Sequence, residues 1–315
     1  MKIKHSIARS MRGISHSKSG LPNQDSLLLK TNGCHQLVAA VADGHGSSNC
    51  FRSDSGSRFA TEIFASIAND LPVFTSYHEA KTYAESLPVK LVNEWKKRVD
   101  NDLVISPYAN HEINESNADN PYLPYGCTFL GCYISSKYAI CLQIGDGEMF
   151  ALYSNGETKY LVPGDDRLNG NATTSLCLPD AEKDFRISVI DLEGEILPEI
   201  IILATDGLGQ SYANDSELLK WGVDLKDIYN AKSGVETLET NLAVWLDDIS
   251  FGASADDISM VAFWLEKEES NLHPDKLNTA RDENAKSTLL KEEKKRKGPF
   301  WFFRNKKNKI FDINN

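Results

Sequence analysis

The sequence lacks the segments that would send the chain into or across a membrane. No run of about eighteen apolar residues is present, so no membrane-spanning helix is predicted. The first residues have no apolar stretch typical of a signal peptide. No two of the six cysteines have Cys-x-x-Cys spacing, which favours buried, reduced thiols over a secreted disulfide framework. We therefore expect a cytoplasmic protein.

Several catalytic and binding motifs are also missing. The sequence has no Gly-x-Ser-x-Gly elbow and no Gly-x-x-x-x-Gly-Lys loop, so neither a serine nucleophile nor a nucleotide-phosphate loop is supported. It has no Asp-x-Asp-x-Asp-Gly loop either, which weakens calcium as a competitor among the cations that prefer oxygen ligands.

Positive charge is scarce over most of the chain. The net charge is −11, but residues 266–315 carry 13 basic and 9 acidic residues, so residues 1–265 sum to −15. An acidic body argues against nucleic acid as the main partner.

The sequence does contain a repeated pattern, a short apolar run that ends at Asp-Gly. It occurs before Asp43-Gly44, before Asp146-Gly147 and before Asp206-Gly207. Such runs predict buried strands, and a buried carboxylate is tolerated only when it is paired or binds a metal. Together with Asp25 and the pair Asp256-Asp257, these strand ends predict a site for hard cations such as Mg²⁺ or Mn²⁺.

Strand-like runs outnumber the helices, which come in pairs. Helical spacing predicts helices over 53–69, 79–99 (with a kink or break at Pro88), 215–221 and 235–248. This pattern suits an α+β fold with two sheets packed on each other and helices outside. Residues 100–124 predict a surface loop, either a flap beside the site or a plain insertion.

The composition changes after residue 265. Residues 266–293 are charged and predict a linker or a lone helix. Residues 294–315 place four consecutive aromatics, Phe300 to Phe303, between two basic clusters. This tail predicts a docking peptide for a protein partner or an anionic membrane surface, or a segment that folds back onto the body.

His45 is the only histidine directly beside a predicted ligand. A lone histidine is commonly structural, but next to Asp43 it is placed to act as a general acid for a leaving alkoxide.

The motifs together resemble the metal-dependent type 2C family of protein serine/threonine phosphatases, in a divergent bacterial branch. They follow the family's order over about residues 5–265. The matching stretches are Asn23-Gln24-Asp25, Val41-Ala42-Asp43-Gly44-His45-Gly46, Gly126-Cys127-Thr128, Ile144-Gly145-Asp146-Gly147, Leu203-Ala204-Thr205-Asp206-Gly207 and Ser254-Ala255-Asp256-Asp257-Ile258-Ser259-Met260-Val261.

The resemblance implies a four-layer α-β-β-α sandwich with two or three Mn²⁺ or Mg²⁺ ions in a cleft at one edge. It also implies attack on phosphorus by metal-activated water, with no phosphoenzyme. By this resemblance, Asp43 bridges two metals, the Gly44 carbonyl is a further ligand, and Asp206 and Asp256 complete one metal site. Gln24 and Asp25 hold the other metal directly or through water, and Asp257 is an added direct or water-mediated ligand. Asp146 binds a weaker additional metal, and His45 is the general acid.

The sequence departs from the family at four places, one of which is Asp146-Gly147-Glu148 where the family has Asp-Ser-Arg. Gln24 replaces a glutamate, Gln210 replaces an acid, and the upstream arginine that often holds the substrate phosphate is missing. Candidates to replace that arginine are His16, Lys18 and Arg12, of which His16 is preferred.

The predicted function is hydrolysis of phosphoserine and phosphothreonine in proteins, opposing a partner kinase. Two alternatives remain open from the sequence. One is a catalytically weak member that serves as a binding or scaffold module, supported by the departures and the tail. The other is a hydrolase of small phosphorylated metabolites.

Overall fold

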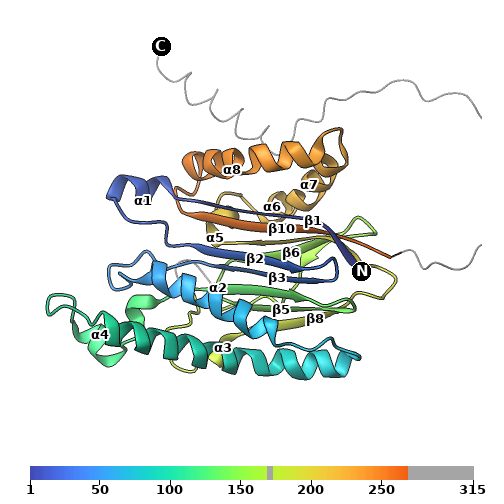
Figure 1. Cartoon of the computed structure of the whole chain (residues 1–315). Coiled ribbons are helices and arrows are strands. Elements are labelled where there is room, and N and C mark those ends of the chain that lie inside the picture. Colours follow the sequence, from blue (N-terminus) through green and yellow to red (C-terminus); the bar gives the residue numbers. More distant parts are fainter. Residues whose placement is uncertain (169–172, 269–315) are drawn as a thin grey trace, which may run out of the picture.

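The computed structural model describes residues 1–168 and 173–268 and contains two antiparallel sheets that lie face to face (Figure 1). One sheet, here sheet A, has the strand order β1-β10-β9-β6-β7, and the other, sheet B, has the order β2-β3-β4-β5-β8. Helices cover the outer face of each sheet. The predicted α+β sandwich of four layers is confirmed.

The strands of each sheet come from distant parts of the chain. Sheet A consists of β1 (Lys2–Met11), β6 (Glu148–Tyr153), β7 (Thr158–Tyr160), β9 (Pro198–Ala204) and β10 (Ile258–Glu266). Sheet B consists of β2 (Ser26–Asn32), β3 (Gln36–Ala42), β4 (Phe129–Ile134), β5 (Tyr138–Ile144) and β8 (Arg186–Asp191).

Long helices form the two outer layers. Sheet B is covered by α2 (Ser53–Asn69) and α3 (Tyr77–Ile105), and sheet A by α7 (Lys220–Asn230) and α8 (Gly234–Gly252). Shorter helices are α1 (Ile14–Ser19), α4 (Glu115–Asp119), α5 (Asp206–Gly209) and α6 (Asp215–Leu218), with 3₁₀ turns η1 (Leu123–Tyr125) and η2 (Ala181–Asp184).

Two expectations about helices were wrong. Helix α3 runs unbroken through Pro88 to Ile105, so part of the predicted loop over 100–124 is helical. An interior proline costs one backbone hydrogen bond, but the face of α3 that carries Leu91 and Trp95 is fully buried against the rest of the core. Helix α1 lies in a segment for which the sequence pattern predicts no helix.

The core has three apolar layers, and strand alternation explains them. In β3, Val38, Ala40 and Ala42 pack in the layer under α2 and α3, whereas the residues between them pack in the layer between the sheets. A third layer lies between sheet A and helices α7 and α8. Because successive side chains of a strand point to opposite faces, a strand buried on both faces is apolar throughout.

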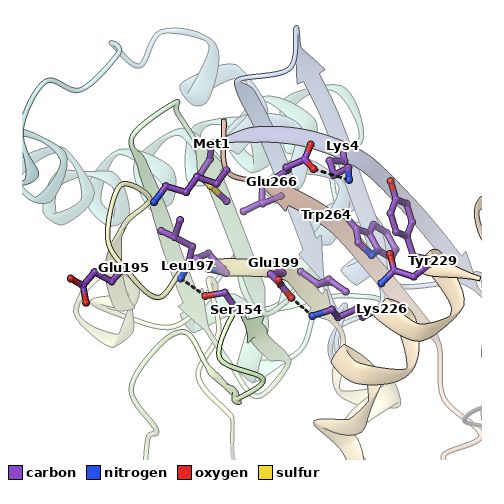
Figure 2. A pocket seen from close by; sticks show the side chains of 15 residues that line it. Met1, Lys4, Ser154, Glu195, Leu197, Glu199, Lys226, Tyr229, Trp264 and Glu266 are labelled. Carbon is purple, nitrogen blue, oxygen red and sulfur yellow. Dashed lines mark hydrogen bonds and ion pairs between the residues drawn. The ribbon is translucent and has the colours of Figure 1, made fainter. Parts of the chain in front are cut away.

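A groove of about 330 Å³ opens at one end of sheet A (Figure 2). Its lining includes Trp264, near the end of β10, and an ion pair between Lys226 Nζ and Glu199 Oε2 at 2.5 Å. Trp264 pairs with Ile200 at the start of β9, so the groove lies at the opposite end of the sheet from the Asp-Gly of residues 206–207. It is separate from the candidate site described below.

None of the helices in the described part of the chain is long and apolar enough to cross a membrane. The predicted linker beyond residue 268 and the predicted tail over 294–315 lie outside the described residues.

Candidate active site

The topology brings the predicted strand ends to one edge of each sheet. In sheet B, Ala42 at the end of β3 pairs with Ser26 at the start of β2, so Asp43 and Asp25 extend from the same edge. In sheet A, Ala204 at the end of β9 pairs with Met260 near the start of β10, which brings Asp206 close to the Asp256-Asp257 pair. Carboxylates separated by more than 200 residues therefore come together.

The loop after β3 is held by close backbone contacts. Asp43 N–H donates to Thr128 Oγ1 at 3.1 Å, and Gly44 N–H donates to the carbonyl of Gln24 at 3.2 Å. A Cβ on Gly44 would lie 2.6 Å from that carbonyl oxygen and 2.8 Å from the carbonyl oxygen of Ser53. Only glycine allows the three backbone segments to approach this closely.

Asp25 is oriented by a threonine that the sequence analysis did not single out. Thr205 Oγ1 donates to Asp25 Oδ2 at 2.7 Å and accepts from Ser259 N–H at 2.9 Å. The other oxygen of Asp25, Oδ1, is buried and has no hydrogen-bond partner within residues 1–168 and 173–268. The residue before the third Asp-Gly is thus part of the site, and its only signal in the sequence was its place in that motif.

Asp206 begins the short helix α5, and its charge raises the pKa of the nearby Asp43 carboxyl group. The Gln210 side-chain amide, one turn later, donates to Asp206 Oδ2. Asp206 Oδ1 is buried and unpartnered in the described part of the chain. The residue where the family has an acid therefore supports the Asp206 carboxylate through a neutral hydrogen bond.

Asp256 follows a strained residue. Ala255 has φ +61°, a left-handed conformation that costs a residue with a Cβ about 1 kcal/mol or more. Its carbonyl accepts hydrogen bonds from Ser15 N–H at 3.0 Å and Ser15 Oγ at 2.6 Å. These contacts tie α1 to the loop that carries Asp256.

Burial and mutual repulsion make the four carboxyl groups reluctant to ionise. Burial raises the pKa of Asp25 and of Asp43 well above the usual range, and each is raised further by neighbouring carboxylates. Burial likewise raises the pKa of Asp206 to about 6, and it raises the pKa of Asp256. A divalent cation would remove this penalty.

Asp146 and His45 lie at the margin of this group. Asp146 Oδ1 accepts from Thr173 Oγ1 at 2.9 Å, and its charge acts on Asp206 and on His45. Burial lowers the pKa of His45, and the nearby Asp146 carboxylate opposes that shift. His45 therefore lies close enough to Asp146 to feel its charge.

Two further residues missed by sequence reasoning hold the Asp146 loop. Gln143 and Arg186 are cross-strand partners, and both donate to the carbonyl of Gly145. Gln143 also donates to the carbonyl of Gly147 at 2.5 Å. Neither residue carries a motif that could have identified this role.

Asp257 is occupied by protein donors. Its Oδ1 accepts from Gly13 N–H at 2.6 Å, and its Oδ2 accepts from Gln24 N–H at 2.6 Å and contacts His16 Nδ1 at 2.8 Å. Its described partners thus use both oxygens to join three segments, in contrast to the orphaned oxygens of Asp25 and Asp206.

The three candidates for phosphate binding differ in exposure. His16 is buried, whereas Lys18 and Arg12 are exposed. Arg12 donates to the backbone carbonyl of His16 at 2.9 Å.

The donor set suits a hydrated hard cation. Within residues 1–168 and 173–268, no group of three or more His, Cys, Asp or Glu side chains is arranged so that it could hold a metal ion by itself. However, Mg²⁺ and related ions keep several waters and need only a few carboxylate or carbonyl ligands. In the described part of the chain, Asp25, Asp206 and Gln24 each have a buried side-chain oxygen without a hydrogen-bond partner, which can serve as a ligand. The raised pKa values of Asp25 and Asp206 show that their negative charge lacks compensation, so these residues fit a divalent cation.

The sequence matches a family model described as protein phosphatase 2C over residues 12–247, about three-quarters of the chain. The chain belongs to the protein phosphatase 2C family. As a member it is a protein serine/threonine phosphatase, as the motifs predicted. The matched range includes every motif quoted above except the last, which spans residues 254–261.

Solved structures show the same fold. The serine/threonine phosphatase Stp1 from Staphylococcus aureus is 13% identical, with a TM-score of 0.56 over 85% of this phosphatase and 96% of Stp1. The Mycobacterium tuberculosis phosphatase PstP/Ppp is 15% identical, with a TM-score of 0.54 over 85% and 100% of the two chains.

A PstP catalytic domain solved with two manganese ions is 16% identical, with a TM-score of 0.53 over 84% and 99% of the chains. No curated protein sequence matches this phosphatase.

Proposed function

We propose that this phosphatase hydrolyses phosphoserine and phosphothreonine in proteins in a metal-dependent reaction, with water attacking phosphorus directly. The observation that carries the proposal is that two buried carboxylate oxygens, Asp25 Oδ1 and Asp206 Oδ1, have no hydrogen-bond partner in the described part of the chain. Leaving such oxygens without a partner is costly, so their arrangement favours a cation ligand.

Each carboxylate has a proposed role. Asp43 and the Gly44 carbonyl would hold cations together with Asp206 and Asp256 at one site and with Gln24 and Asp25 at the other. Asp146 serves a third, weaker site. Mn²⁺ or Mg²⁺ bound there lowers the pKa of water and offsets the charge of the phosphoryl group. Thr205, Gln210 and Thr128 hold the first ligands in place.

His45 is proposed to hold the proton that the leaving serine or threonine oxygen takes up. The Asp146 carboxylate favours the protonated ring, while burial disfavours it. These opposing effects keep the ring ready to release its proton.

The proposed catalytic domain spans residues 1–265, followed by a linker over 266–293 and a docking tail over 294–315. The end of β10 at Glu266 supports the first boundary. We further propose a cytoplasmic phosphoprotein substrate, an opposing kinase, and a protein or anionic membrane surface as the partner of the tail.

The test is turnover of p-nitrophenyl phosphate and of a phosphothreonine peptide with Mn²⁺, Mg²⁺ or EDTA. Wild type is compared with Asp43→Ala and with Asp247→Ala, which changes an exposed acid on α8. We expect turnover of both substrates only with metal, lost in Asp43→Ala and kept in Asp247→Ala. A folded wild type that turns over neither substrate with either metal would favour the scaffold alternative instead.

A further inference from the structure

A buried hydrogen-bonded pair lies beside the carboxylates and has no role in the chemistry proposed above. His16, on α1, is 9% exposed, and Asp257 is 3% exposed. His16 Nδ1 contacts Asp257 Oδ2 at 2.8 Å, and the same carboxylate accepts the backbone N–H groups of Gly13 and Gln24. These contacts fix the carboxylate and, through it, the orientation of the imidazole ring.

The free edge of the ring borders a small space that it shares with Gln24. A Cβ built on Gly46 would lie 3.8 Å from His16 Nε2 and 3.8 Å from Gln24 Oε1. Gln24 is 5% exposed, and its Oε1 has no hydrogen-bond partner in the described part of the chain. Its amide nitrogen donates to Ser53 Oγ at 2.8 Å, which turns Oε1 toward this space.

The chemistry of His16 Nε2 and Gln24 Oε1 determines which kind of ion can occupy the space between them. A neutral His16 ring that donates its Nδ1 proton to Asp257 presents a lone pair at Nε2, and Gln24 Oε1 can only accept. Two lone pairs attract a cation and repel the oxygens of a phosphate group. A carboxylate that holds the far nitrogen of a histidine is also the usual outer support of a metal-binding histidine.

We propose that His16 is a nitrogen ligand of the divalent cation bound beside Gln24, with Asp257 as the residue that orients it. This inference rests on the proposed function, because it assumes a cation at the carboxylates. An imidazole and a neutral amide replace carboxylate charge on this side of the site. Since imidazole suits transition metals better than Mg²⁺, the pair shifts the preference of the phosphatase toward Mn²⁺.

The test is pulsed electron paramagnetic resonance of Mn²⁺ bound to the full chain, with natural-abundance and ¹⁵N-labelled histidine. We expect a histidine-nitrogen coupling in wild type, lost in His16→Gln and kept in the matched variant His45→Gln. Mn²⁺ titration should show an affinity about 10- to 100-fold lower for His16→Gln, with a smaller change for Mg²⁺. The isotope comparison on wild type needs no variant to fold.

The outcomes separate this inference from the proposed function. A wild type that binds Mn²⁺ and turns over substrate without any histidine coupling overturns the inference alone, as does a coupling lost in His45→Gln instead. Unchanged Mn²⁺ affinity in His16→Gln together with weaker inhibition by inorganic phosphate assigns the ring to phosphate binding and also overturns it. A wild type that binds no Mn²⁺ overturns both.

Discussion

Replacing Asp206 by asparagine should separate stability from function. The folded state raises the pKa of Asp206 from 3.8 to about 6, which corresponds to about 3 kcal/mol. When folding raises the pKa of an acid, ionisation of that acid opposes folding. The penalty is absent below about pH 4, grows between pH 4 and 6, and is complete above pH 6. Metal-free Asp206→Asn should therefore be about 2–3 kcal/mol more stable than wild type at pH 7.

The asparagine keeps the shape of the side chain, and its amide oxygen can still accept from the Gln210 amide, so no cavity or lost contact offsets the gain. With Mn²⁺ the order should reverse. Cation at about 100 times its dissociation constant stabilises wild type by about 2.7 kcal/mol, and the variant should gain much less and show no turnover.

The assay is urea unfolding at pH 4 and pH 7, in EDTA and in Mn²⁺, with Asp247→Asn on the exposed face of α8 as the control. The control should match wild type in all four conditions. If Asp206→Asn were as stable as wild type, or less so, in EDTA at pH 7 with an unchanged slope against urea, the electrostatic reasoning would be refuted. Equal Mn²⁺ stabilisation of both proteins would refute the role of Asp206 as a ligand.

Three further predictions concern packing and the tail. Gly44→Ala should lower the free energy of unfolding, measured with urea, by about 1–3 kcal/mol, because its Cβ would meet two carbonyl oxygens. Gly164→Ala, with open space around it, should leave the free energy of unfolding nearly unchanged. Equal effects of the two substitutions would contradict the close backbone approach at Gly44. In α8, Leu242→Ala should cost about 2–5 kcal/mol by thermal or urea unfolding, and the exposed Val244→Ala less than about 0.5; similar losses would show that the apolar layer under α8 is misassigned. Deleting residues 294–315 should leave p-nitrophenyl phosphate turnover unchanged but weaken sedimentation with anionic vesicles or capture of a partner protein; loss of folding would instead make the tail part of the body.

The architecture was predictable because strand ends and alternation are local properties. The apolar runs before Asp43, Asp146 and Asp206 are continuous because their strands are buried on both faces, and each ends where its carboxylate leaves the core. That pattern predicted the layers and which acids would gather. The resemblance to the family then predicted that these acids lie together in a cleft at one edge of the sandwich.

The support of the site was not predictable, because it depends on contacts between distant backbone segments. Nothing in the spacing of Asp257 says that its oxygens are taken by residues some 240 positions away. The hydrogen bond from Thr205 to Asp25 likewise spans 180 positions. Helix α3 runs through Pro88 because burial of the face that carries Leu91 and Trp95 outweighs the cost of an interior proline.

The pairing of β1 with β10 has a consequence for synthesis of the chain. Among the strands of residues 1–168 and 173–268, β1 pairs with β10 alone, from Lys2 with Glu266 to Met11 with Ile258. During synthesis on the ribosome, β1 therefore has no pairing partner until β10 has been made. The loop of residues 256–257 contacts α1 only once β10 pairs with β1. Contacts this distant in sequence form slowly. A nascent chain can thus assemble sheet B early, yet its carboxylate centre is completed only after residue 266 has emerged, so an unfinished phosphatase cannot act on its surroundings.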